Sequence, residues 1–378
     1  MKTIPISSAN NYLSLELLQH LYNEEKNIFF SPFSISTAFG MLYLGARNQT
    51  ADQMKEVLGY SFGHLSNDEV NKQFASVLRE ISDVDSNKYQ LNVANKLVAQ
   101  QNFDILQTYK ENLKKYFETT IDSADFAHNS VAATDAINEW VKQQTHDKIV
   151  KLLSEPLSPL TRLVLLNAVY FKGIWETKFL KNETREEIFF NRGISEFKTQ
   201  MMRRNGKFNF TEIPELDSKL LEFPYSGDDI SLYIVLPNER QGLKSVKSKL
   251  TDFALIEKSI SQLKEVDVQV TIPKFKIETS YSLKDQLSQL GMKEVFTPSA
   301  DLSGIDGRKD LEVSEVIHKA VIEVNEEGSE AAAATAIVVV LTSSVTHEPK
   351  VQYFIADHPF AFFIRDNRNG MTLFAGHI

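Results

Sequence analysis

The first third of the chain carries hydrophobic residues at helical spacing, and a second helical stretch follows near residue 140. In both places apolar residues recur three or four positions apart, and the first stretch ends in a polar run at residues 23–27. The pattern predicts helices around residues 13–21 and 134–145. The apolar positions that define their buried faces are Leu13, Leu17, Leu18, Leu21, Ile137, Trp140 and Val141.

The middle and the end of the chain carry strand patterns instead. Residues 163–171 and 230–236 are short apolar runs rich in strand formers, which is typical of strands buried on both faces. Residues 266–272 alternate between apolar and polar, as a half-buried strand does. Two further strand-like segments, 360–364 and 372–375, flank a turn signal. Because helices come first and strands later, without β-α-β alternation, the sequence predicts an α+β fold with mixed or antiparallel sheets.

The composition removes several classes of function. The 378 residues allow one large domain or two ordinary ones. The chain has no cysteine, which excludes disulfides, thiolate catalysis and zinc–thiolate sites. A net charge of −9 argues against nucleic acid or an anionic membrane as the partner. No apolar run approaches the ~18 residues of a membrane helix.

The start of the chain bears on its location. It has no apolar secretory core, and the absence of disulfides points in the same direction. An intracellular protein is therefore favoured, with secretion after removal of a leader as the alternative. The glycosylation sequons that start at Asn48, Asn182 and Asn209 are interpreted as chance occurrences.

A search for catalytic signatures finds none. The sequence lacks G-x-S-x-G, H-E-x-x-H, G-x-x-x-x-G-K and G-x-G-x-x-G motifs. Its eight histidines are scattered, and no two have the spacing of metal ligands. We expect no enzyme activity, no metal and no cofactor.

Residues 326–346 form the most unusual segment of the chain. A run of four alanines at 331–334 is followed by β-branched residues at 337–340, and nothing charged occurs from 331 to 346. One interpretation is a permanently buried core strand. The other is a strand that slides between two existing strands, for which small leading side chains are suited. Gly328 would then supply a hinge without a Cβ atom.

Seven segments of the sequence, in order, resemble one family. They are residues 27–39, 137–141, 167–175, 301–305, 318–320, 326–336 and 357–360. Each is weak alone, but the ordered set resembles the serpins, a family of single-use protease inhibitors, from about residue 10 to 376.

The resemblance implies a single serpin domain over residues 1–378, with about nine helices, three β-sheets and a reactive-centre loop at residues 326–350. It also implies three groups of functional residues. The hinge of the loop comprises Gly328, Ser329, Glu330, Ala331, Ala332, Ala333, Ala334 and Thr335. The shutter residues, a polar network beneath the main sheet, are Ser31, Ser34, Asn167 and His318. The breach residues, where the loop first enters the sheet, are Trp175, Lys274 and Glu326.

The same resemblance implies a mechanism and a cleavage point. A protease would attack the loop and form a covalent acyl-enzyme, and the cut loop would insert into the main sheet with the protease attached. Family spacing places the scissile bond between Thr342 and Ser343, with Val340 and Leu341 as specificity residues. No Lys or Arg lies nearby, so a trypsin-like target is not expected. Leu341 slightly favours a papain-like cysteine protease, and an elastase- or chymotrypsin-like serine protease is the alternative.

The sequence argues against two other kinds of serpin. A non-inhibitory carrier or storage serpin would carry bulky or charged hinge residues, which are absent here. Strong activation by heparin would need a basic helix, but residues 69–82 contain one Lys and one Arg against two Glu. We expect a monomer whose partner is the target protease.

Overall fold

The computed structural model describes residues 3–23, 25–82, 88–327 and 351–378. Within these ranges the helices predicted around residues 13–21 and 134–145 are present as parts of α1 and α6. The α-helices are α1 (Pro5–Leu21), α2 (Pro32–Tyr43), α3 (Asn48–Val57), α4 (Asn67–Ser82), α5 (Gln107–Phe117), α6 (Phe126–Gln144), α7 (Leu243–Lys249), α8 (Phe253–Ser261), α9 (Lys284–Gln289) and α10 (Ser303–Asp306). Short 3₁₀ turns are η1 (Lys181–Glu183), η2 (Pro214–Leu216) and η3 (Glu294–Phe296).

A five-stranded sheet forms one half of the molecule. Its strand order is β10 (Phe275–Ser282), β11 (Val313–Val324), β4 (Leu163–Gly173), β2 (Tyr89–Gln100) and β3 (Ile121–Ala124). The central pair, β4 and β11, is parallel, while the neighbours of this pair on either side are antiparallel to it. The predicted buried strand at residues 163–171 is therefore confirmed, and it lies in the middle of this sheet.

A nine-stranded sheet forms the other half. The strands in order are β1 (Ile28–Phe30), β14 (Met371–His377), β13 (Ala361–Asp366), β8 (Ile230–Pro237), β7 (Ser218–Pro224), β6 (Ser195–Ile213), β9 (Lys264–Pro273) and β12 (Gln352–Ile355), and β5 (Arg185–Asn191) also pairs with β6. The other four predicted strands correspond to β8, β9, β13 and β14.

The number of sheets differs from the expected three, because among the described residues the strands outside the five-stranded sheet form one hydrogen-bonded path. The cause is the length of β6. Successive parts of this 19-residue strand pair with β5, β9 and β7, so β6 joins two groups of strands that would otherwise be separate. The number of α-helices in the described ranges is ten, close to the nine expected.

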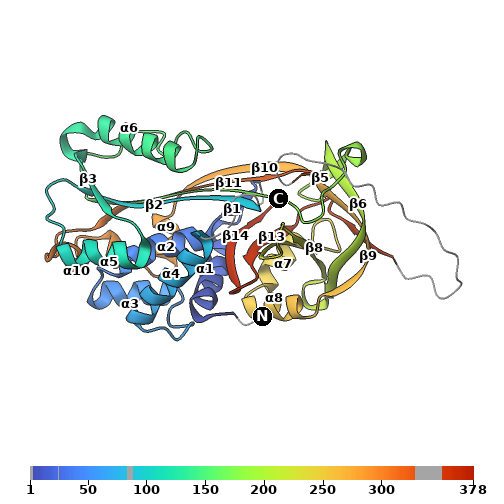
Figure 1. The fold of residues 1–378 in the computed structure, drawn as a ribbon, viewed down its shortest axis with the longest axis horizontal. Helices are drawn as coiled ribbons and strands as arrows, with labels where there is room; N and C mark the ends of the chain where they lie inside the picture. The colour runs from blue at the N-terminus through green and yellow to red at the C-terminus, as the bar shows by residue number, and fades with distance from the viewer. Residues whose placement is uncertain (1–2, 24, 83–87, 328–350) are drawn as a thin grey trace, which may run out of the picture.

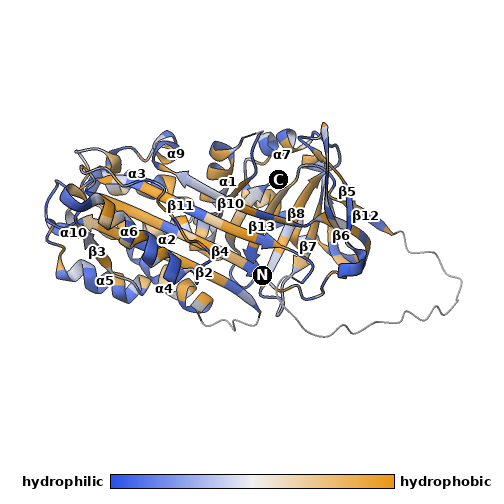
Figure 2. Cartoon of the chain, turned by 90° about the horizontal axis from the view of Figure 1, so that it is seen from above, coloured by the Kyte–Doolittle hydropathy of each residue, from blue (hydrophilic) through white to orange (hydrophobic). Residues whose placement is uncertain are grey.

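The two faces of the five-stranded sheet have different cover. Helices α1 to α5 lie on one side, and α6 lies alone across the other (Figure 1). The main hydrophobic core fills the space between the sheet, the helix cluster and the nine-stranded sheet. A smaller core lies under α6, where Phe126, Ile137 and Val141 pack against Val164 and Leu166 of β4. Hydrophobic positions follow β4 along most of its length (Figure 2), as expected for a strand covered on both sides.

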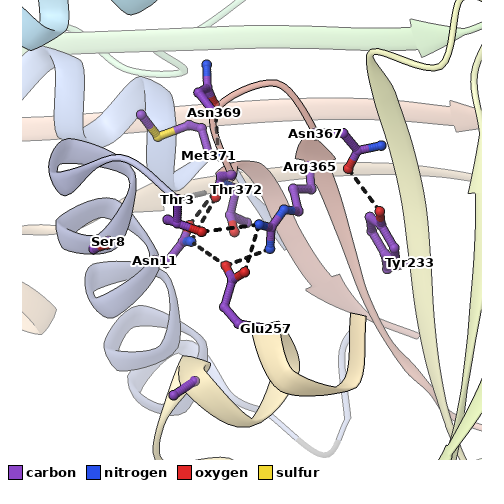
Figure 3. A network of polar contacts seen from close by, with 12 residues as sticks. Thr3, Ser8, Asn11, Tyr233, Glu257, Arg365, Asn367, Asn369, Met371 and Thr372 are labelled. Carbon is purple, nitrogen blue, oxygen red and sulfur yellow. Dashed lines mark hydrogen bonds and ion pairs between the residues drawn. The ribbon is translucent and has the colours of Figure 1, made fainter. Parts of the chain in front are cut away.

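A polar network ties α1 and α8 to β13 and β14 (Figure 3). Both terminal nitrogens of Arg365, on β13, donate to the two carboxylate oxygens of Glu257, on α8, at 2.6 and 2.8 Å. Asn11 of α1 donates to the Gly370 carbonyl at 2.9 Å and accepts from the Thr372 backbone N–H at 3.0 Å. This network holds helices and strands that lie more than 100 residues apart in the sequence.

Candidate functional site: the central seam of the five-stranded sheet

The four shutter residues meet at the middle of the seam between β4 and β11. Asn167 lies on β4 and His318 on β11, and the two residues are direct partners in the parallel register. Ser31 is the N-cap of α2, and Ser34 lies in its first turn. All four side chains are at least 98% buried. Ser31 and His318 are 287 positions apart in the sequence, and the fold brings all four residues together.

A continuous set of hydrogen bonds joins these residues. The Ser31 hydroxyl donates to the Leu373 carbonyl at 2.7 Å and accepts from the Ser34 backbone N–H at 3.1 Å. The Asn167 amide nitrogen donates to the Ser34 hydroxyl at 2.5 Å, and the Asn167 carbonyl oxygen contacts Nδ1 of His318. The seam is thus crossed by a side-chain contact in addition to the backbone ladder.

The protonation of His318 follows from its partners. The Ser31 backbone N–H donates to Nε2 of His318 at 3.1 Å, so Nε2 must carry a lone pair. Nδ1 then carries the proton and donates to the Asn167 carbonyl oxygen. Full burial lowers the pKa of His318 from 6.5 to about 3, because the charged ring would lose its solvation. The ring is neutral at physiological pH, and a second proton would place a donor against the Ser31 N–H.

Two residues of this cluster were missed by the sequence analysis. Asn95 of β2 accepts from the Ser34 hydroxyl at 2.8 Å and from the Asn167 amide at 2.5 Å. The Tyr281 ring of β10 stacks on His318 with ring centroids 6.3 Å apart. The residue type of Asn95 does not single it out, because Asn92 and Lys96 in the same strand are also polar. Its pairing with Asn167 depends on strand register, which the sequence does not show.

The breach residues gather at one end of the same seam, beyond the last residues of β4 and β11. Trp175 is 3% exposed and stacks on Tyr225 with centroids 4.5 Å apart. Its indole N–H donates to the Asn325 carbonyl at 2.7 Å, directly after the end of β11. Lys274 Nζ lies 3.0 Å from a carboxylate oxygen of Glu326.

The charge of Glu326 is held in place by its surroundings. Its residue is 5% exposed, and burial alone would raise the pKa of its carboxyl. Hydrogen bonds from its own backbone N–H and from Lys274 outweigh that effect, so the pKa lies below its usual value. Next to it, Lys181 forms an ion pair with Glu327. Glu326 and Glu327, the last described residues before position 328, thus each form an ion pair with a lysine from another part of the chain.

Both described flanks of the 328–350 segment reach the same aromatic cluster. On one flank, the Trp175 backbone N–H donates to the Glu327 carbonyl at 3.4 Å. On the other, the fully buried Phe354 of β12 lies 6.4 Å from the ring of Phe223. Phe223 is in turn 6.0 Å from Trp175. The two described flanks of the segment therefore lie at the same end of the molecule.

The hinge, scissile and specificity residues lie outside the described residues. These are Gly328, Ser329, Glu330, Ala331, Ala332, Ala333, Ala334 and Thr335 of the hinge, Val340 and Leu341, and the Thr342–Ser343 bond. Within the described ranges, no group of three or more His, Asp or Glu side chains is arranged to hold a metal ion. Over the same ranges, no helix combines the length and apolar character that crossing a bilayer requires.

Comparisons with known proteins agree with this geometry. The family model described as "Serpin (serine protease inhibitor)" matches residues 8–378. The chain is 42% identical to "Intracellular coagulation inhibitor 2" of Tachypleus tridentatus over 99% of this chain and 90% of that protein. It is 41% identical to human "Serpin B4" over 98% of each. The solved structure of Serpin48 from the insect Tenebrio molitor superimposes with a TM-score of 0.85 at 35% identity, covering 99% of this chain and 97% of that one.

Proposed function

Because the chain belongs to the serpin family, described as serine protease inhibitors, we propose that it is not an enzyme and that it traps its target protease as a suicide substrate. The protease cleaves the loop at residues 326–350 and becomes attached to it as an acyl-enzyme. The freed N-terminal part of the loop then inserts between β4 and β11. The attached protease is carried along the seam before the ester or thioester can be hydrolysed.

The observation that carries this proposal is the parallel pair at the centre of the sheet. β4 and β11 bond directly to each other, so no strand lies between them. A chain that turns back after the end of β11 runs antiparallel to β11, and therefore also antiparallel to β4. Its insertion replaces one parallel pairing by two antiparallel pairings, which are slightly more stable per residue. The inserted strand also buries its apolar side chains, which supplies further driving force.

We assign separate roles to the two clusters along the seam. The breach residues hold the loop's N-terminal flank at the entry point, where Glu326 pairs with Lys274. The shutter residues keep the middle of the seam closed through the His318–Asn167 contact. Strand insertion must break that contact, and α6, which packs on the sheet over the same strands, must shift to admit the new strand.

Two classes of protease are compatible with the proposed bait. Leu341 as the second residue before the bond suits the apolar pocket of a papain-like cysteine protease, and we place this class first. The description of the matching family names serine proteases, which supports the elastase- or chymotrypsin-like alternative. We further propose that the protein is a monomer. We also propose that heparin does not activate it strongly, because on α4 Lys72 is paired with Asp68 and Arg79 donates to the Ala75 carbonyl. The name of the Tachypleus relative supports an intracellular setting.

One experiment tests the mechanism and the target together. The protein is incubated with a cathepsin-L-like and an elastase-like protease, covalent complexes are separated under denaturing conditions, and the released C-terminal peptide is sequenced. We expect a stable complex and a peptide that begins at Ser343. Ala331→Arg should leave the uncut protein folded but convert it to a substrate, because insertion would bury a charge. A variant that inhibits as well as the parent would contradict loop insertion.

The choice of class has its own variants. Leu341→Asp should abolish inhibition of the cathepsin-L-like protease, while Thr342→Gly should be tolerated, since one apolar pocket contributes a few kcal/mol. If Thr342→Gly reduces inhibition more than Leu341→Asp, and a stable complex forms only with the elastase-like protease, the target belongs to the serine class.

A further inference from the structure

The strand β12 exposes an apolar row. Tyr353 and Ile355 of the strand, and Val351 directly before it, are 56%, 44% and 45% exposed and alternate with the residues of the other face. Phe354, between Tyr353 and Ile355, is fully buried on the opposite face. The row of three apolar residues thus lies on the face that the rest of the described chain leaves exposed, while Phe354 on the other face is covered.

This row lies where charged residues are usual. Among the described residues, β12 ends the path of the nine-stranded sheet and pairs on one side only, with β9. Edge strands of this kind are generally protected by charged side chains, proline or bulges. Here the cross-strand neighbour of Tyr353 is the exposed, polar Gln269, followed by the exposed Asn205 on β6. Lys219 donates to the Tyr353 carbonyl at 3.1 Å. An apolar row with a polar border is typical of a protein interaction surface.

The position of the row in the chain indicates which partner covers it. Val351 is eight residues after Ser343, the residue that follows the proposed scissile bond, and eight residues span at most about 28 Å. The other described flank, Glu327, is fifteen residues before Thr342 and can lie up to about 50 Å away. A protease domain of ~230 residues has a radius of gyration of about 17 Å and extends further at its rim. A protease seated on the bait is thus held close to β12 by the shorter of the two connections.

We propose that Val351, Tyr353 and Ile355 form a secondary docking surface for the body of the target protease, outside its active-site cleft. The inference rests on the proposed function, because it requires that the loop is the bait. The matching surface on the protease is apolar and lies on the rim that faces the residues after the cleaved bond. Contact there lengthens the life of the first, non-covalent complex, so that more encounters proceed to cleavage and trapping.

The test separates docking from trapping. The double variant Tyr353→Thr/Ile355→Thr removes the apolar surface and keeps residues that favour strands. The matched control is Leu160→Thr, since Leu160 is 86% exposed and precedes the start of β4, at the end of the seam opposite Trp175. Each protein is tested for the second-order rate constant of inhibition, the number of inhibitor molecules used per protease, and the melting temperature before and after nicking of the loop.

The expected result is a fall in the rate constant by about tenfold or more for the double variant, which corresponds to roughly 1.4 kcal/mol of contact energy. The number of molecules used and the gain in melting temperature on nicking should match those of the parent, and Leu160→Thr should match in all three. An unchanged rate constant, or an equal fall with Leu160→Thr, would overturn the docking surface while the proposed function stands. Self-association of the parent that the double variant abolishes would assign the row to a second copy of the chain instead. If the parent forms no covalent complex with the cathepsin-L-like protease and none with the elastase-like protease, both proposals are overturned.

Discussion

The shutter residues and the Arg365 network are both buried polar clusters, but they are built differently. The shutter contains only neutral groups and crosses a parallel pair of strands, with His318 on β11 facing Asn167 on β4. The Arg365 network contains a bidentate ion pair between Arg365 and Glu257. It joins helices to strands β13 and β14, which are antiparallel to each other. One cluster lies on a seam between two strands, and the other lies where a helix is fixed to a sheet.

The difference bears on which part of the molecule can open. Breaking a neutral hydrogen bond costs about 1 kcal/mol of net stability. The polar groups freed when β4 and β11 separate can also find new partners on an incoming strand. Separation of Arg365 from Glu257 would leave a charge buried without a partner, which is far more costly. The comparison indicates that the seam is the part of this fold able to rearrange, while the Arg365 network remains fixed.

The largest effect is expected when the fixed network is broken. Glu257→Ala should lower the free energy of unfolding by about 3 kcal/mol, because Arg365, at 5% exposure, keeps its charge without a counter-ion. Denaturant unfolding of the uncut protein measures the loss, and Glu257→Gln, which retains an acceptor, should lose less. The rate of spontaneous loop insertion should stay at the parent value. Faster insertion in Glu257→Ala would contradict the division between the two clusters.

Breaking the seam should have a smaller effect on stability but a distinct effect on conversion. Asn167→Ala leaves Nδ1 of His318 and the Ser34 hydroxyl without their Asn167 partner, at about 2 kcal/mol of unfolding free energy. It should also accelerate spontaneous insertion on prolonged incubation. The matched control is Asn10→Ala on α1, because Asn10 is also fully buried and donates to the Thr372 carbonyl at 2.8 Å.

The control variant decides the interpretation of that result. Asn10→Ala should lose a similar amount of stability without any gain in the rate of insertion. Equal acceleration in both variants would mean that general destabilisation, rather than the seam, controls conversion.

Acid should weaken the seam through His318. Its native pKa is lowered from 6.5 to about 3 by burial, so below pH 6.5 the unfolded chain binds a proton that the native state does not. Stability conferred by the neutral ring is therefore present above pH 6.5 and falls by up to about 1.4 kcal/mol per unit as the pH drops toward 3. Unfolding from pH 7 to 5, before most carboxylates titrate, measures the slope.

A second buried histidine provides the control for the acid experiment. Burial lowers the pKa of His377 to about 4, so it adds a slope of the same sign. His377→Asn should remove that part and leave the part due to His318. A stability that does not change between pH 7 and 5 in His377→Asn would contradict the assignment of a neutral His318.

The predictable part of this fold followed from local pattern. The alternation at residues 266–272 and the apolar run at 163–171 identified β9 and β4, because side-chain periodicity reflects which faces are covered. The continuous second sheet was not foreseen. It depends on one strand, β6, being long enough to pair with β5, β9 and β7 in turn, and its exposed first half carries no clear periodicity.

The candidate site shows the same division. Ser31, Asn167, His318 and Trp175 were chosen through motifs that resemble a family, and their grouping in space agrees with that choice. Asn95 was missed because its role depends on register: it faces Asn167 only because β2 and β4 pair at those positions. The apolar row on β12 was also missed, since Val351, Tyr353 and Ile355 read as an ordinary strand until their exposure is known.

The smallest predicted effect lies at the breach. Its polar groups are intermediate in character, because it contains an ion pair like the Arg365 network but lies on the seam like the shutter residues. The ion pair there joins a buried carboxylate, Glu326, to a lysine whose side chain is 45% exposed, so water screens the lysine and the pair is worth little. Lys274→Gln keeps a donor near Glu326 and removes the charge, and we expect a loss of at most about 1 kcal/mol in unfolding free energy. The pKa of Glu326 should rise toward its usual value, because one of the contacts that hold it down is weakened.

Lys258→Gln is the matched control, because Lys258 contacts Glu215 at the same 3.0 Å but on the surface of α8, away from the seam. If the seam is the part that moves, Lys274→Gln should speed insertion slightly and Lys258→Gln should not. A loss of 3 kcal/mol in Lys274→Gln would instead place the breach with the fixed network.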